Sequence, residues 1–88
     1  MAKKQTNKNL KPYEIFVINM KGLMAMRGVT PDEMVEYMNL SRSTYYKRIR
    51  EPYRFTMGEM ASAAKRLGVD ASAMIAKVMD VMEVTMSA

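Results

Sequence analysis

The sequence predicts a single all-α domain of five helices, and three observations carry this prediction. Apolar residues recur every three or four positions over most of the chain, which is the period of one helix face. Helix-start signals, such as the TPDE stretch at 30–33, and helix-ending glycines, such as Gly28 and Gly68, separate these apolar segments. No segment shows the alternating pattern of a strand. A chain of 88 residues has room for one core only.

The chain begins with a basic segment that is followed by the first predicted helix. Residues 1–11, MAKKQTNKNLK, hold four Lys and no acid and lack periodicity, so we expect a flexible basic arm. The first helix is predicted to begin at Pro12, which suits a first helical position, and to end before Gly28. Its inward-facing residues are Phe16, Met20, Leu23 and Met24. The predicted domain therefore covers residues 12–88.

Two short helices are predicted next, separated by a short turn. The first covers residues 31–38, with Thr30 as its N-cap and Glu33 reaching back to complete a capping box. The apolar pattern breaks at Asn39–Leu40, and Ser41 then caps a helix that continues to about residue 50. The expected inward residues of this pair are Met34, Val35, Met38, Tyr45 and Ile49.

The remaining chain predicts two more helices. Pro52 ends the preceding helix, because the residue before a proline is driven out of helical geometry. Thr56 and Glu59 form a second predicted capping box, which opens a fourth helix that ends before Gly68. The inward residues of this helix are Met60, Ala63, Ala64 and Leu67. Asp70 caps a fifth helix that we expect to cover about residues 71–86.

The composition argues against an enzyme and against a cofactor. The chain has no Cys and no His, which excludes thiolate nucleophiles, the usual zinc sites and imidazole acid–base chemistry. The acid pairs Asp32/Glu33 and Asp80/Glu83 belong to helix ends or solvated faces, where nothing would tune them for catalysis. Twelve Met could suggest soft-metal binding, but filling helical cores is the favoured interpretation.

The same composition predicts a soluble cytoplasmic protein whose charge is segregated. Charged residues interrupt every apolar run before the roughly 20 residues that a membrane span needs, and the N-terminus lacks the apolar region of a secretory signal. The net charge is +5. Residues 41–54 hold five Arg or Lys against one acid, whereas residues 28–40 hold three acids and no base. One side of the protein is therefore expected to face a polyanion.

The short helix, turn and second short helix at about residues 30–50 form a predicted helix–turn–helix unit. Its second helix, residues 42–50, can enter a major groove, which at about 12 Å wide accepts an α-helix. We expect Arg42, Ser43 and Tyr46 to meet base edges, since they lie on the outward side near the helix start. The residues expected at phosphates are Ser41, Lys47, Arg48, Arg50 and Arg54, with Lys3 and Lys4 of the arm.

Simpler interpretations stand beside these assignments. A basic stretch is often only a solvated helix face, and DNA contact is favoured here because the charge coincides with the turn geometry. Tyr46 could instead cover the stems of neighbouring Arg or Lys side chains. Tyr45 is expected in the core, while Tyr53 and Phe55 are expected to fasten the loop that follows. Lys3 and Lys4 could belong to an ordinary disordered start.

Residues 19–49, NMKGLMAMRGVTPDEMVEYMNLSRSTYYKRI, resemble the helix–turn–helix of phage repressor and Cro-like regulators, the XRE-type family. The segments STYYKRIREPYRFTMGEM and AAKRLGV are similar to a phage-type branch, and the resemblance covers about residues 14–76. It implies sequence-specific binding of double-stranded DNA, usually by a dimer on a palindromic operator, by a regulator of phage or mobile-element origin. Pro31 departs from the family pattern, which often has a phosphate-gripping Gln there, and Pro lacks both that donor and its backbone N–H.

The last predicted helix is apolar on more than one face, which one small core cannot cover. Self-association through Met79, Met82 and Met86 would cover it and would give the two-fold symmetry of an operator, so we expect a homodimer. The alternative is a tail that frays or packs over the first helix. No small-molecule ligand is expected. The alternative function is a protein–protein interaction module, such as an adaptor, an antitoxin-like partner or a phage assembly component. RNA binding is a third and less favoured hypothesis, because the sequence lacks the repeated exposed aromatic residues on which RNA bases stack.

Overall fold

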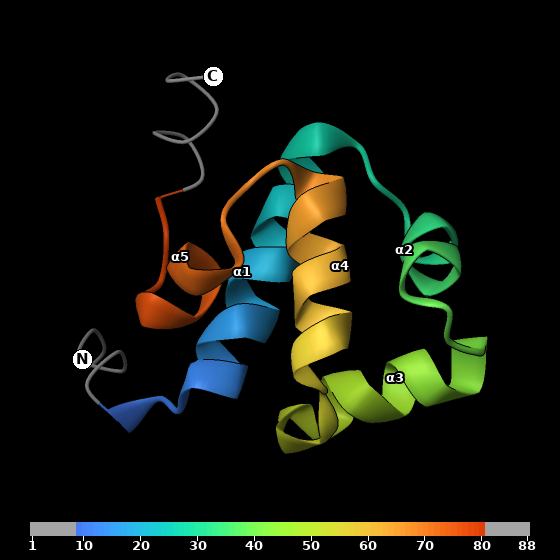
Figure 1. Ribbon diagram of the computed structural model, residues 1–88, viewed down its shortest axis with the longest axis horizontal. Coiled ribbons are helices and arrows are strands. Elements are labelled where there is room, and N and C mark those ends of the chain that lie inside the picture. The colour runs from blue at the N-terminus through green and yellow to red at the C-terminus, as the bar shows by residue number, and fades with distance from the viewer. Residues whose placement is uncertain (1–8, 81–88) are drawn as a thin grey trace.

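A computed structural model of the chain describes residues 9–80, which fold into five α-helices and one short 3-10 helix (Figure 1). Within this range there is no strand, which confirms the all-α prediction. The elements in chain order are α1 (Pro12–Arg27), α2 (Pro31–Met38), α3 (Arg42–Arg50), η2 (Pro52–Arg54), α4 (Met57–Leu67) and α5 (Ala71–Ala76).

Side-chain caps fix where α2 and α4 begin. The Thr30 hydroxyl accepts the backbone N–H of Glu33 at 3.2 Å, and the Glu33 carboxylate accepts the Thr30 N–H at 2.9 Å. Thr56 and Glu59 repeat this arrangement at the start of α4, with both distances 3.0 Å. Each box satisfies two backbone groups that a helix start otherwise leaves without partners. Both predicted capping boxes are confirmed.

Left-handed residues end three of the helices. Gly28 closes α1 with φ 71°, and Gly68 closes α4 with φ 76°, a conformation that glycine adopts without a steric penalty. Asn39 closes α2 with φ 61° and is the one described non-glycine residue with positive φ. Asparagine is among the few residues that tolerate this conformation. With this left-handed turn at Asn39, only three residues, 39–41, separate the end of α2 from the start of α3.

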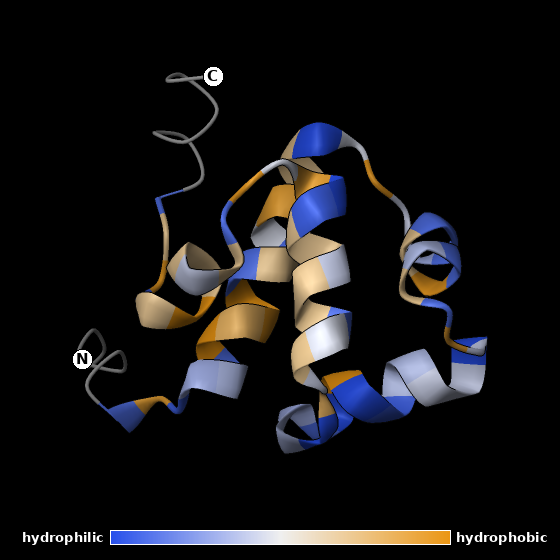
Figure 2. Cartoon of the chain, viewed as in Figure 1, coloured by the Kyte–Doolittle hydropathy of each residue, from blue (hydrophilic) through white to orange (hydrophobic). Residues whose placement is uncertain are grey.

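The core forms around α1, which packs against α4, α5 and η2, while α2 packs against α4 (Figure 1). The side chains that it encloses completely or nearly so are Phe16, Met20, Leu23, Met34, Ala63, Ala64, Leu67 and Met74. Phe55, in the connection to α4, meets Phe16 edge to face with ring centroids 5.1 Å apart. Phe55 thus fastens this connection to the body as expected. Figure 2 shows apolar residues concentrated on α1 and the inner side of α4, whereas most of α3 is hydrophilic.

A buried asparagine ties the end of α5 to α1. The Asn19 side chain is 1% exposed, and its amide nitrogen donates to the backbone carbonyls of Met74 and Lys77, each at 2.9 Å. Its amide oxygen accepts the backbone N–H of Met79 at 2.7 Å. One buried side chain therefore satisfies three backbone groups that a short terminal helix would leave unpaired.

This contact corrects the expected extent of the fifth helix. α5 ends at Ala76, and Lys77 has an extended backbone with φ −160° and ψ 161°. A single helix over residues 71–86 is therefore wrong, because the Asn19 side chain holds residues 77–79 in a non-helical path over α1. Met79 is partly buried against the core. Of the residues expected to form a dimer, Met82 and Met86 lie outside the described range, as do Lys3 and Lys4 of the arm.

Among residues 9–80, no helix combines the length and the apolar character that crossing a membrane requires.

Candidate nucleic-acid interface

The outer side of α3 collects the residues that the sequence singled out for base contact. Five of its nine residues are exposed, namely Arg42, Ser43, Tyr46, Lys47 and Arg50. At 3.6 residues per turn these positions fall within an arc of about 140° around the helix. They form one continuous polar and basic face, which we call the α3 outer face.

The inner side of α3 is locked to the body by an aromatic ring. Tyr45 is 3% exposed and its hydroxyl donates to the Met24 sulfur of α1 at 3.7 Å. Burial, and then the neighbouring Tyr46, raises the pKa of the Tyr45 hydroxyl above its ordinary value. Ile49 packs partly buried against the same core. The helix can therefore present its outer face without rotating about its own axis.

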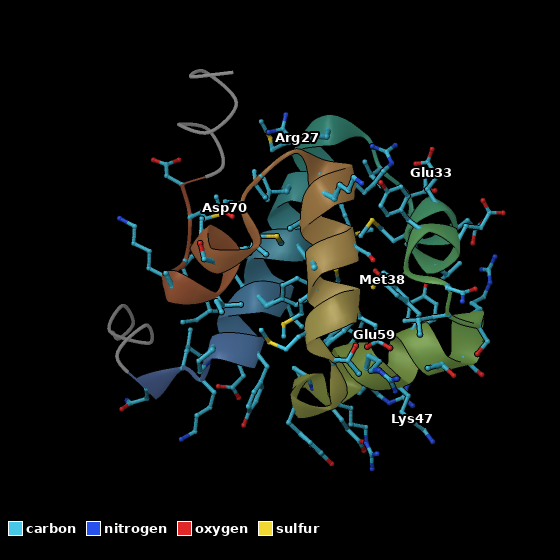
Figure 3. All side chains as sticks on the ribbon, in the orientation of Figure 1. Arg27, Glu33, Met38, Lys47, Glu59 and Asp70 are labelled. Carbon is cyan, nitrogen blue, oxygen red and sulfur yellow. The ribbon has the colours of Figure 1, made fainter. Side chains whose placement is uncertain are left out.

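Arg48 is not part of the α3 outer face. Its guanidinium donates two hydrogen bonds, both 3.0 Å, to the Glu59 carboxylate of α4, and only 20% of its side chain is exposed. These bonds lower the pKa of Glu59 and raise that of Arg48. In Figure 3 the labelled Glu59 lies between α4 and α3. The geometry thus turns this expected phosphate ligand into a link between two helices.

Arg42, at the first position of α3, reaches across to α2. Its terminal nitrogen forms an ion pair with a carboxylate oxygen of Asp32, and both side chains stay largely exposed, 64% for Arg42 and 67% for Asp32. A carboxylate oxygen of Glu33 in α2 lies 3.8 Å from a terminal guanidinium nitrogen of Arg66 in α4. Two of the three acids of α2 are therefore paired with cations of this chain, which reduces the repulsion that they would exert on a polyanion.

Ser41 is occupied by its capping role. Its hydroxyl accepts the backbone N–H of Thr44 at 3.1 Å and donates to the Thr44 hydroxyl at 2.8 Å. The Ser43 hydroxyl oxygen lies 3.5 Å from the Ser41 hydroxyl oxygen. The predicted N-cap is confirmed, and any contact of Ser41 with a phosphate would have to share this hydroxyl.

Tyr46 is the aromatic member of the α3 outer face. Its side chain is 40% exposed, and its ring stands edge-on to that of Tyr45 with centroids 5.1 Å apart. It also borders a largely apolar pocket of about 460 Å³ between α1, the start of α2 and α3. The other lining residues are Lys21, Met24, Val29, Pro31, Tyr45 and Ile49. The sequence pattern did not indicate this pocket.

The loop after α3 carries one further cation, Arg54, close to the acid Glu51. Arg54 pairs with Glu51 and lies over the Tyr53 ring, with its guanidinium carbon 5.4 Å from the ring centroid. The hydrogen bond from Arg54, helped by the charges of Lys47 and Arg50, lowers the pKa of Glu51. Tyr53 also meets the Tyr13 ring of α1 edge to face at 6.3 Å, so it fastens the loop to the body.

Lys47 and Arg50 differ from the other cations of this region. Within residues 9–80 neither forms an ion pair with a carboxylate, whereas Arg42, Arg48 and Arg54 each do. The Lys47 side chain points away from the body of the protein in Figure 3. These two side chains are therefore the charges on α3 that no carboxylate of the described residues neutralises.

Comparison of the chain with protein-family models, with curated proteins and with solved structures found no match.

Proposed function

We propose that this protein is a sequence-specific, double-stranded DNA-binding transcription regulator without enzymatic activity. In this proposal α2, the turn at residues 39–41 and α3 act as a helix–turn–helix, and the α3 outer face enters the major groove. The observation that carries the proposal is the division of α3 into two sides. Arg42, Ser43 and Tyr46 are exposed near its start, while Tyr45 fixes the opposite side to the core.

The chemistry of the exposed side chains suits base edges. An arginine offers two parallel donors to the acceptor pair of guanine, and the Ser43 and Tyr46 hydroxyls can donate or accept. Lys47 and Arg50, one turn further along, would neutralise phosphates beside the groove. Arg54 would join them through the nitrogens that it does not use on Glu51. Arg48 is assigned no phosphate in this proposal.

The expected homodimer stays part of the proposal, but its contact through Met79 loses support. Met79 packs against the core of its own chain and donates its backbone N–H to Asn19. A palindromic binding site would nevertheless require two copies in two-fold arrangement. Analytical ultracentrifugation at tens of micromolar protein, a range typical of weak protein association, tests whether the free chain is a dimer.

Selection of bound sites from random duplex DNA tests the proposed function. Enrichment of a short motif supports sequence-specific binding, and a palindromic motif supports the dimer. Arg42→Ala with Tyr46→Ala is expected to relax the preference at the contacted bases while keeping residual affinity for any duplex. Lys65→Ala is the matched control, because Lys65 is an exposed cation near the far end of α4. Failure to enrich any motif, with the chain folded, would refute base recognition.

One observation favours the alternative, a protein–protein interaction module. An apolar groove of about 290 Å³ lies between α4 and α5, lined by Met57, Met60, Ala61, Ala71, Ser72 and Ile75. Met57 is 75% exposed, which is unusual for a large apolar side chain. Duplex binding that is absent or insensitive to salt, together with a stable complex with another protein, would favour this function over the first.

A further inference from the structure

We infer that Asp32 is a positioning residue that sets the base preference of Arg42. This inference rests on the proposed function and adds to it. It assigns to an acidic residue on α2 the task of aiming the Arg42 guanidinium at a guanine in the major groove, although Asp32 itself contacts no base.

The geometry that points to this role is an ion pair across the two helices. Asp32 is the second residue of α2 and Arg42 the first residue of α3, and one terminal nitrogen of Arg42 bonds one carboxylate oxygen of Asp32. The remaining guanidinium donors stay exposed, because 64% of the Arg42 side chain is open to solvent. Arginine has five N–H donors in a rigid plane, so a partner on one edge leaves others for a base.

Stability alone does not account for the pair. Ion pairs between exposed side chains contribute little to folding because water and salt screen them. A long arginine side chain in solvent is otherwise spread over many rotamers, and a base contact would have to restrict all of them. Holding the guanidinium before DNA arrives removes part of that entropic penalty. The Arg42–Asp32 ion pair therefore favours paired hydrogen bonds from Arg42 to guanine, because these bonds require a fixed direction of the guanidinium.

The charge of Asp32 adds selectivity by a second route. A carboxylate beside the guanidinium weakens the attraction of Arg42 for a phosphate, which any sequence offers. Geometry-dependent base contacts lose less from this neutralisation. Asp32 thus lowers the affinity for non-specific DNA and raises the discrimination between base pairs.

The experiment compares Asp32→Ala with Glu36→Gln, which removes the same charge from the same helix. Glu36 is exposed and forms no ion pair with any residue of the described range. Affinity is measured for the best selected duplex and for duplexes changed at each base pair. Asp32→Ala is expected to reduce discrimination at one G·C pair by about five- to tenfold, within the range of a good bidentate contact. Affinity for unrelated duplex is expected to hold or rise.

Arg42→Ala supplies the decisive comparison. In that background Asp32→Ala should change the base preference no further, because the residue that it positions is gone. If the wild type discriminates and Arg42→Ala abolishes the preference at one pair, but Asp32→Ala leaves it intact, the inference fails while the proposed function stands. Absence of any sequence preference in the wild type would overturn both.

A measurement without DNA tests the positioning itself. The Nε–H group of Arg42, followed by nitrogen-15 relaxation in the free protein, is expected to become more mobile in Asp32→Ala and to stay unchanged in Glu36→Gln. Asp32→Glu, which keeps the carboxylate, should restore part of the order. An Arg42 side chain that is equally mobile in the wild type and in Asp32→Ala would overturn the inference whatever the DNA data show.

Discussion

Arg48 of α3 and Glu59 of α4 are joined by two parallel hydrogen bonds of 3.0 Å, and both side chains are largely shielded from solvent. The same Glu59 carboxylate accepts the Thr56 N–H that begins α4. A single acid therefore fixes both the start of α4 and the end of α3. One of the five basic residues between 41 and 54 is consequently used to hold the fold together rather than to meet a partner.

Removing Arg48 should destabilise the protein through this link. Arg48→Ala leaves a shielded carboxylate without its cation, and we expect the free energy of unfolding to fall by about 1–2 kcal/mol. Arg50→Ala on the same helix is the matched control, with an expected change within about 0.5 kcal/mol. Urea denaturation measures both, and a double-mutant cycle with Glu59→Gln isolates the coupling. Equal effects of the two arginine variants would contradict this structural role for Arg48.

The ion pair between Arg48 and Glu59 should also make the free energy of unfolding depend on pH. Because hydrogen bonds from Arg48 hold the folded-state pKa of Glu59 below its ordinary value, the stabilisation is present above the unfolded-state pKa of about 4.3. It is lost as the pH falls through the lower folded-state pKa. The difference in unfolding free energy between wild type and Glu59→Gln should therefore be largest near neutral pH and shrink below about pH 4.3. If the difference in unfolding free energy stays constant down to acid denaturation, the ion pair does not stabilise the fold through the charge of Glu59.

Asn19 is expected to be a stability hot spot of the fold. Asn19→Ala leaves the carbonyls of Met74 and Lys77 and the N–H of Met79 without their partner, and the predicted loss is about 2–4 kcal/mol. Hydrogen exchange should show lost protection of the Met79 amide. Ile18→Ala is the control, since Ile18 is the preceding residue and is 43% exposed. A Met79 amide that exchanges at the wild-type rate in Asn19→Ala would contradict the proposed tether.

The helix starts and ends could be predicted because their signals are local. A capping box spans four residues and a left-handed glycine only one, so the bounds of α1 to α4 follow from short stretches of sequence. The buried stripe of α1 follows from helical periodicity for the same reason. Arg42 and Tyr46 are one helical turn apart and therefore share a face of α3. Their outward placement follows from the inward placement of Tyr45 on the same helix.

The end of α5 could not be predicted in this way, because it depends on Asn19, which lies 55 or more residues earlier in the chain. One signal was present. Asn19 falls three residues after Phe16 and four before Leu23, so it lies on the buried stripe of α1, where a polar side chain needs partners. The pairs Arg48–Glu59 and Arg42–Asp32 join different helices, and their formation depends on packing that charge counting along the sequence does not reveal.

The division of the basic residues into structural and exposed cations predicts how salt affects DNA binding. Each phosphate neutralised contributes about 0.9 to the slope of log affinity against log salt concentration. Lys47→Ala and Arg50→Ala should each reduce that slope by close to one unit on any sequence. Arg48→Ala should change it much less, because its guanidinium already pairs with Glu59. Fluorescence anisotropy of a labelled duplex, titrated at several salt concentrations and at a temperature where all variants are folded, gives the slopes. A reduction for Arg48→Ala equal to that for Lys47→Ala would show that the pair with Glu59 opens when DNA binds, and would return Arg48 to the set of phosphate contacts.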